Sequence, residues 1–147
     1  MSIDTGTIKF ELANGWGQFP DSVKLGQVPG AAVDSQDRVY ILNRGNPSLI
    51  VLDRDGKYVD SLGEDVLEDP HGINIGPNNT LYIADRDAHI IVLLSSEGKL
   101  GLTIGTRGRP SGEQSGMPFN RPTSAAVSSQ DDIFISDGYA NSRVHKY

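Results

Sequence analysis

The stretch PHGINIGPNNTLYIAD, residues 70–85, decides the fold, because its pattern occurs three times in this chain of 147 residues. Each unit has a short segment that begins with proline, a polar turn, and an apolar segment that ends on an acid or amide. The other two units span residues 29–43 and 122–137. The first offset is 42 residues, since Asn43 matches Asp85, and the second is 52, since Asp85 matches Asp137. Repetition at such a period is the signature of a repeat fold.

The first two units continue in step beyond residue 85. LIVL at 49–52 matches IVLL at 91–94, and YVDSL at 58–62 matches LGLTI at 100–104. Between them lie hairpin turns that contain Gly56 and Gly98, where a positive φ costs glycine little. Four short strands in about 42 residues are the arithmetic of a β-propeller blade. A β-sandwich is the alternative, but it does not require whole four-strand units to repeat in register. We therefore predict an all-β chain, a β-propeller of four-stranded blades.

The predicted strands of each blade, A to D in chain order, give an uneven count. The domain plan has an N-terminal strand and lead-in at 1–27, blade 1 at 28–69, blade 2 at 70–121 and an incomplete blade 3 at 122–147. Blade 3 has strands A and B, then a strand C at 143–147, and lacks strand D. Residues 7–13 alternate like a strand and form an orphan strand D. The total is twelve strands, or three blades' worth.

Three blades do not close a ring, because propellers have four to eight. Two chains related by a two-fold axis make six blades, with each N-terminal strand completing the third blade of its partner. We therefore predict a homodimer that forms a six-bladed propeller. The alternative is that the chain is a piece of a longer single-chain propeller.

Composition narrows the class of protein. The net charge is −6, with 13 basic and 19 acidic residues, which argues against binding nucleic acid. The longest apolar run is Ile90–Leu94, too short to span a membrane. Cysteine is absent, which removes disulfides, thiolate metal sites and cysteine nucleophiles. We expect no membrane partner and a cytoplasmic location.

Several motifs resemble the NHL-repeat family, and within it most closely the peptidyl-α-hydroxyglycine α-amidating lyases. The chain resembles the N-terminal half of that single-chain, six-bladed family. The motifs are GWG at 15–17, LGQ at 25–27, AVDS at 32–35, RVY at 38–40, NRG at 43–45, DPHG at 69–72, FNRP at 119–122 and SDGYANSR at 136–143.

The resemblance implies roles for individual positions. Arg44 matches the arginine that holds the substrate carboxylate, and Tyr139 matches the tyrosine proposed as the catalytic base. His71 matches one of three histidine ligands of zinc. The carbonyls of Ala31 and Ile73 match positions that contribute to a structural calcium. Zinc and calcium are therefore the cofactors that the resemblance implies.

Two further residues join the predicted ligand-binding set. Arg86 occupies in the second unit the place that Arg44 has in the first, and Asn141 lies in the SDGYANSR motif. Antiparallel neighbours place the start of strand A beside the end of strand B, so His71, Arg44 and Tyr139 are predicted to share one rim. The alternative for Arg44 is an ion pair with a nearby aspartate at the rim, and for Tyr139 it is packing over residues 141–143.

The zinc site is incomplete in this chain, since a catalytic zinc takes three protein ligands and the resemblance supplies only His71. We expect His89 to be a solvated loop residue and His145 an outer-blade residue. Asp85 and Asp137 are expected to hydrogen-bond their own B-to-C turns. The leading expectation is a non-catalytic module that binds a small molecule, a peptide or a protein. The alternative is a metal-dependent lyase that cleaves a carbinolamide to an amide and glyoxylate.

Overall fold

The computed structural model describes residues 2–4, 6, 8–115 and 118–147. Within these ranges the chain forms thirteen strands and one short 3-10 turn, Pro77–Asn79. Eleven strands make three antiparallel sheets in chain order. Blade 1 consists of β3 (Gly30–Val33), β4 (Val39–Leu42), β5 (Leu49–Leu52) and β6 (Tyr58–Leu62). Blade 2 consists of β7 (Pro70–Ile75), β8 (Leu81–Asp85), β9 (Ile90–Leu94) and β10 (Leu100–Gly105), and blade 3 of β11 (Ser124–Val127), β12 (Ile133–Asp137) and β13 (Arg143–Lys146).

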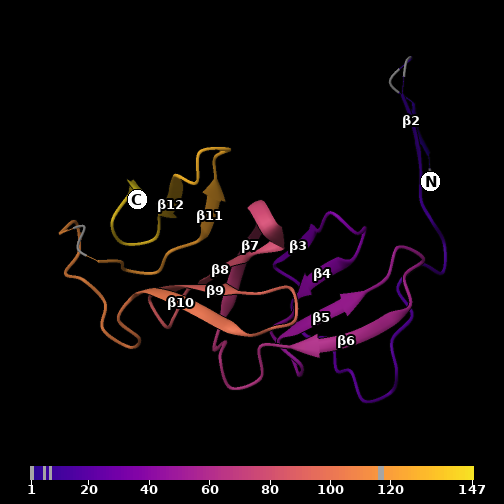
Figure 1. Ribbon diagram of the computed structural model, residues 1–147, viewed down its shortest axis with the longest axis horizontal. Coiled ribbons are helices and arrows are strands. Elements are labelled where there is room, and N and C mark those ends of the chain that lie inside the picture. The colour runs from indigo at the N-terminus through magenta and orange to yellow at the C-terminus, as the bar shows by residue number, and fades with distance from the viewer. Residues whose placement is uncertain (1, 5, 7, 116–117) are drawn as a thin grey trace.

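The three blades stand side by side in an arc (Figure 1). Their first strands, β3, β7 and β11, adjoin one another on the inner side of the arc. The fourth strands, β6 and β10, lie on the opposite, outer side. The predicted four-stranded blades are confirmed for blades 1 and 2, and blade 3 has the three predicted strands.

Apolar side chains fill the spaces between blades. Between blades 1 and 2, alternate residues of the middle strands pack together, among them Tyr40, Leu49, Ile83 and Val92. Between blades 2 and 3 the core includes Phe119, which comes from the loop before β11. Alternation along each strand sends side chains to both faces, so a blade needs a neighbour on each side to bury them. No helix in the described part of the chain is long and apolar enough to cross a membrane.

The face of blade 1 that points away from blade 2, called here its outer face, is covered by the chain's own lead-in segment, residues 13–28. Phe19 and Val23 pack there against Ile41, Ile50 and Leu52. Trp16 donates its indole N–H to the carbonyl oxygen of Arg54 at 3.2 Å. The lead-in therefore stands where a preceding blade would be in a closed ring.

The N-terminus forms a separate two-stranded hairpin. Strand β2 (Lys9–Glu11) pairs with β1 (Ser2–Asp4), and the hairpin projects away from the blades (Figure 1). The predicted strand at 7–13 is confirmed over Lys9–Glu11, while residue 7 lies outside the described residues. Strand β1 was not expected, and it raises the count from twelve strands to thirteen.

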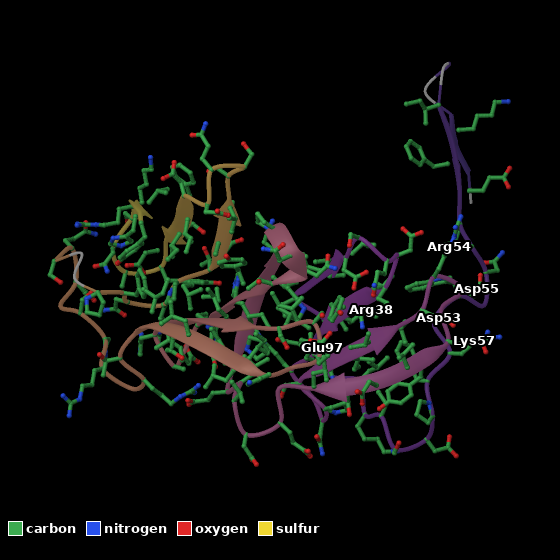
Figure 2. All side chains as sticks on the ribbon, in the orientation of Figure 1. Arg38, Asp53, Arg54, Asp55, Lys57 and Glu97 are labelled. Carbon is green, nitrogen blue, oxygen red and sulfur yellow. The ribbon has the colours of Figure 1, made fainter. Side chains whose placement is uncertain are left out.

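Side chains at the start of the tight turns hold those turns closed. In blade 1 the Asp34 carboxylate accepts N–H bonds from Gln36 and Arg38, and Asp53 accepts them from Asp55 and Lys57. Figure 2 labels the charged side chains at the β5–β6 turn, which are Asp53, Arg54, Asp55 and Lys57. Gly56 and Gly98 both have positive φ, at 82° and 80°, as their turn positions predict.

Candidate functional site

The rim at which the B strands end collects the predicted site residues. Arg44 follows β4, Arg86 follows β8, Tyr139 follows β12, and His71 lies near the start of β7. Contacts among their side chains and with Asp69 join all four into one cluster. The prediction that His71, Arg44 and Tyr139 share a rim is confirmed.

Asp69 is the centre of this rim cluster. Arg44 Nε lies 2.8 Å from Asp69 Oδ1, and Arg86 Nη2 lies 2.6 Å from Asp69 Oδ2. Two arginines from neighbouring blades therefore share one carboxylate, which confirms the rim ion pair as the setting of Arg44. The sequence signal for this partner was the DPHG motif, whose first residue receives no role from the resemblance.

Arg44 is held in a fixed orientation. Its Nε also donates to the Pro70 carbonyl at 3.2 Å, and its Nη1 donates to Gln27 Oε1 at 3.0 Å. Its Nη2 is buried and makes no hydrogen bond with the described residues. A buried donor without a partner costs about 1–3 kcal/mol, so an acceptor that reached Nη2 would gain from it.

His71 and Tyr139 form the second half of the cluster. His71 Nδ1 lies 3.0 Å from the Thr123 carbonyl oxygen, which only accepts, so Nδ1 carries the proton. His71 Nε2 therefore accepts from the Tyr139 hydroxyl at 3.2 Å. The two rings meet edge to face with centroids 5.7 Å apart. Tyr139 is 57% exposed, which makes it the part of the cluster open to solvent.

Arg86 connects the two halves electrostatically. Its guanidinium carbon lies 5.6 Å from the centre of the Tyr139 ring. The hydrogen bond to Asp87 raises the pKa of Arg86; burial opposes this, and Asp69 and Tyr139 add to it. The same Arg86 hydrogen bond is the main reason that the pKa of Asp87 is lowered. Both groups are therefore firmly ionised at neutral pH, and a cation lies beside Tyr139.

Asn141 lies away from the cluster. It is 1% exposed, and its Nδ2 donates to Asp137 Oδ2 at 2.5 Å and to Ser111 Oγ at 2.9 Å. A ligand at the rim does not reach this amide without displacing those partners. The structure therefore gives Asn141 a place in the support of a loop, and its contact with a ligand stays a prediction.

The polar residue at the end of each B strand ties down the loop that leads into its own blade. Asp85 accepts from the N–H groups of Glu68 and Asp69, both at 2.8 Å. The expected bond of Asp85 to its own B-to-C turn is wrong, because in the described residues its hydrogen bonds go to the loop before β7 instead. This contact fixes the backbone of Asp69, the centre of the rim cluster.

The same bond recurs in the other two blades. Asn43 Oδ1 accepts from Gly26 N–H at 2.8 Å, and Asp137 Oδ1 accepts from Asn120 N–H at 3.0 Å. Asp137 also accepts from Asn141, so its expected contact with its own turn is confirmed. All three side chains are fully buried.

The described residues do not assemble a zinc site within one chain. They contain no group of three His, Asp, Glu or Cys side chains placed to hold a metal ion. His71 has the protonation that a ligand needs, with Nε2 unprotonated, but it stands alone. Ala31 and Ile73, the residues implied for calcium, lie on the adjoining strands β3 and β7. Their role stays an implication of the resemblance.

The other two histidines face elsewhere. His89 Nδ1 accepts from the Arg121 N–H at 3.1 Å, so His89 is tied into a loop. His145 Nε2 lies 3.1 Å from Asp137 Oδ2, and its ring meets that of Phe119 edge-on. His145 lies on β13, the outermost strand of blade 3, as expected, and its side chain is only 12% exposed.

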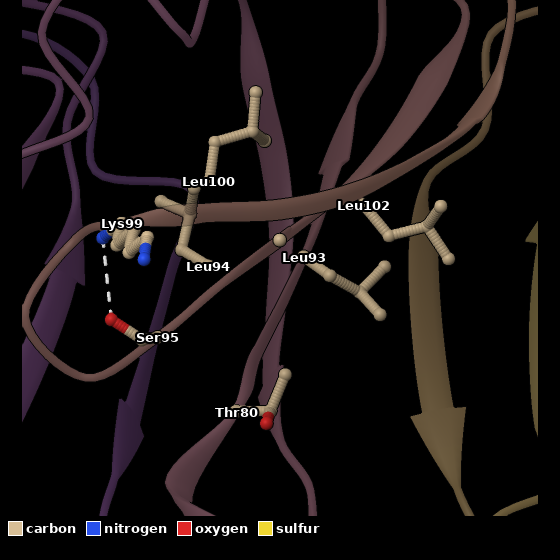
Figure 3. Close-up of a pocket in the computed structure, with 8 residues that line it drawn as sticks. Thr80, Leu93, Leu94, Ser95, Lys99, Leu100 and Leu102 are labelled. Atoms are coloured by element: carbon tan, nitrogen blue, oxygen red, sulfur yellow. Dashed lines mark hydrogen bonds between the residues drawn. The ribbon is translucent and has the colours of Figure 1, made fainter.

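A shallow apolar pocket of about 270 Å³ lies on blade 2 at the opposite rim, where β8 begins (Figure 3). Its charged lining residue is Lys99, and the strands β9 and β10 change register beside it, between Leu100 and Leu102. It shares no residue with the rim cluster. The lining residues are Thr80, Leu93, Leu94, Ser95, Lys99, Leu100, Gly101 and Leu102.

Comparison with known proteins supports both the fold and the resemblance. Residues 119–147 match the family described as NHL repeat. The chain is 26% identical to a probable peptidyl-alpha-hydroxyglycine alpha-amidating lyase of Caenorhabditis elegans, over 89% of this chain and 44% of that protein. It is 32% identical to peptidyl-alpha-hydroxyglycine alpha-amidating lyase 2 of Drosophila melanogaster, over 84% of this chain and 36% of that protein. The chain thus spans less than half the length of these relatives.

Solved structures show the same fold at low sequence identity. A streptogramin B lyase superposes with a TM-score of 0.58 at 16% identity, over 99% of this chain and 46% of that one. The virginiamycin B lyase of Staphylococcus aureus gives a TM-score of 0.57 at 14% identity, over 95% of this chain and 44% of that one. The chain is an all-β, NHL-type propeller segment, and along most of its length it is similar in sequence to the amidating lyases.

Proposed function

We propose that this chain, an NHL-type propeller that resembles the amidating lyases, is a binding module. Its rim receives a small molecule or peptide that carries a carboxylate, and it releases that ligand unchanged. The observation that carries the proposal is the buried Nη2 of Arg44, which has no partner among the described residues. A guanidinium is suited to a carboxylate because its planar fork donates two parallel hydrogen bonds.

The surroundings of Arg44 support recognition. Gln27, Asp69 and the Pro70 carbonyl already orient the guanidinium, so little side-chain freedom is lost on binding. Arg86 adds a second cation, and the exposed Tyr139 offers a hydroxyl and a ring face at the mouth of the cluster. Asp69 neutralises part of this charge, so the ligand must compete with it or share the two arginines.

The absence of turnover is supported by the protonation of the cluster. The Tyr139 hydroxyl donates to His71 Nε2, so in this arrangement the hydroxyl keeps its proton and His71 is its acceptor. The described residues of one chain do not fit a zinc centre, because a catalytic zinc takes three protein ligands and His71 has no second or third ligand beside it.

The test is a calorimetric titration with N-acetylglycine, which carries a carboxylate, and with its amide as the matched ligand. The acid should bind and the amide should not. Arg44→Gln should weaken binding of the acid at least about tenfold, since a charged hydrogen bond is worth about 1.5–3 kcal/mol. Arg54→Gln, at an 81% exposed arginine on a distant turn, is the control and should leave binding unchanged. Equal binding of acid and amide would overturn the proposal.

A lyase is the second candidate, and the sequence similarity to the amidating lyases favours it. In that reaction the C–N bond of a peptidyl-α-hydroxyglycine breaks, the hydroxyl proton leaves to a base, and the amide nitrogen gains a proton. Release of glyoxylate by the purified chain with added zinc, lost in Tyr139→Phe, would establish it. Zinc bound by the chain and lost in His71→Ala would assign the ligand. With neither glyoxylate nor bound zinc, the binding module stands.

A further inference from the structure

Blade 3 ends in an uncovered strand. Strand β13 pairs with β12 along one edge, and no strand lies along its other edge within the described part of the chain. In blades 1 and 2 the corresponding edges carry β6 and β10. Val144 on β13 is 65% exposed, and Phe134 on β12 is 38% exposed. An edge strand with exposed apolar side chains is a template for another strand.

Strand β2 has the chemistry of a missing fourth strand. Apolar and charged residues alternate through it, and Phe10 and Leu12 are 57% and 64% exposed. Such alternation gives a strand one apolar face, which needs a sheet to cover. The β1–β2 hairpin projects away from its own blades, so these side chains contact none of the three cores (Figure 1).

The complete blades give the register for such a strand. Leu62 of β6 stands opposite Leu49, and Ile104 of β10 stands opposite Ile91. Each of these fourth-strand residues is the last apolar side chain of its strand and is followed by glycine. Leu12 lies directly after β2, is the last large apolar residue in the alternation of Ile8, Phe10 and Leu12, and is followed by Ala13. Leu12 is therefore the equivalent of Leu62 and Ile104.

The third strands align through their partners on the second strands. Leu49 pairs with Leu42, and Ile91 pairs with Ala84; these partners directly precede Asn43 and Asp85. In blade 3, Val144 pairs with Ser136, which directly precedes Asp137. Val144 is therefore the equivalent of Leu49 and Ile91. A fourth strand on blade 3 that follows the other blades places Leu12 opposite Val144.

We propose that strand β2 of one copy of this chain adds to the free edge of β13 of a second copy, with Leu12 opposite Val144. In this register Glu11 lies opposite His145 and on the same side as Arg143, whose charge is opposite to that of Glu11. Phe10 lies opposite Lys146, beside the exposed Phe134. The new strand thus meets Val144, Phe134 and the stem of Lys146 on one face, and Arg143 and His145 on the other.

The lead-in makes the exchange reciprocal. Residues 13–28 run from β2 into blade 1 of the same copy, so a copy that donates β2 places its own blade 1 next to the acceptor's blade 3. A two-fold axis then repeats the contact, so that the third blade of each copy gains a fourth strand. Backbone hydrogen bonds of the added strand supply affinity, and the alternating side chains supply register. This proposal does not depend on the ligand proposed for the rim.

The first test is light scattering of the purified chain at several concentrations. A dimer of twice 15.8 kDa is expected. Phe10→Asp, which puts a charge on the docking face of the projecting hairpin, should shift it to monomer. Val59→Asp is the matched control, because Val59 is 51% exposed on the fourth strand of blade 1, which is already paired. A chain that stays monomeric at every concentration would overturn the proposal, and circular dichroism checks that each variant is folded.

The second test fixes the register and uses the absence of native cysteine. Under mild oxidation, the double variant Leu12→Cys with Val144→Cys should give a disulfide-linked dimer on a non-reducing gel. The pair Glu11→Cys with Val144→Cys is the control, because adjacent residues of a strand point to opposite faces. Equal cross-linking of both pairs, or of neither, would contradict the proposed register.

Discussion

The two ends of the arc share one repeat pattern but differ in cover. At the blade 1 end, Phe19 and Val23 of the lead-in pack over Ile41, Ile50 and Leu52, of which Ile50 is fully buried. At the blade 3 end, Phe134 and Val144 face solvent. The difference shows that apolar side chains in a repeat protein are buried only where a neighbouring unit or segment covers them, since each unit has apolar side chains on both of its faces.

The largest expected effect comes from emptying the covered end. Ile50→Ala should lower the free energy of unfolding by about 4 kcal/mol, because it deletes buried methyl groups and leaves a cavity. Phe134→Ala at the open end should lower it by less than about 1 kcal/mol. Urea denaturation of both variants in the Phe10→Asp background measures this without any contribution from association. Similar losses at the two ends would show that blade 3 is covered after all.

The polar residues at the two B-strand ends should also respond differently. Asn43 donates to the carbonyls of Lys24 and Pro47, which a carboxylate at neutral pH cannot do. Asn43→Asp should therefore cost about 3 kcal/mol by burying an unpaired charge against acceptors. Asp137→Asn keeps an acceptor for Asn120 but turns an amide N–H2 toward the donor of Asn141, whose unpaired Oδ1 can accept from it only after that amide flips, so it should cost about 1–2 kcal/mol. Thermal unfolding of the two variants gives the ratio, and the reverse order would refute this interpretation of the bonds.

The lead-in itself can be tested as a cover. Phe19→Ala should lower the free energy of unfolding by about 2 kcal/mol, because Phe19 packs on the outer face of blade 1 but is only partly buried. Leu25→Ala, at a position 51% exposed in the same segment, is the matched control and should cost less than about 0.5 kcal/mol. Chemical denaturation measures both. A loss for Leu25→Ala as large as that for Phe19→Ala would mean that the segment contributes as a whole.

The smallest effect concerns pH at equivalent turns of blades 1 and 3. Burial raises the pKa of Asp34, but hydrogen bonds from Arg38 and Gln36 outweigh it and leave the pKa below 3.8. The lowered pKa means that this carboxylate stabilises the fold above pH 4 and loses that effect as the pH falls further. Asp34→Asn should cost about 1 kcal/mol at pH 7 and progressively less below pH 4.

Ser128 closes the same turn of blade 3 with a hydroxyl, which accepts from Gln130 and Asp132. The cost of Ser128→Ala should therefore not depend on pH in this range. Urea denaturation of both variants between pH 2.5 and 7 makes the comparison. A cost of Asp34→Asn that stays constant across that range would contradict the lowered pKa.

The strands were predictable because the repeat states them several times. The apolar segments predicted at the ends of the units 29–43 and 70–85 are the strands β4 and β8, which end within one residue of Asn43 and Asp85. Strand β1 has no counterpart in the repeat, so the repeat pattern did not predict it. The gathering of Arg44, His71 and Tyr139 also followed from strand order, because the direction of antiparallel strands fixes which ends meet.

The misses came from contacts that join different parts of the chain. Asp69 bonds arginines of two blades, and nothing in its neighbourhood in sequence reveals either. The burial of the His145 side chain was not predicted, because blade 3 has a longer turn between its second and third strands. In blade 2, Ile83 pairs with Val92, nine residues on, whereas in blade 3 Ile135 pairs with His145, ten residues on. One added residue moves a side chain to the other face of the sheet.

The bond from each B-strand end to the loop before its own blade has an evolutionary consequence. The donor lies 17 residues upstream in all three cases, at Gly26, Glu68 and Asn120. Both partners of this hydrogen bond therefore belong to the same blade and the loop before it. If a gene segment that begins just before one of these donors is duplicated, the new blade keeps this hydrogen bond. Propellers can therefore gain or lose blades by recombination without losing the bond that holds the loop.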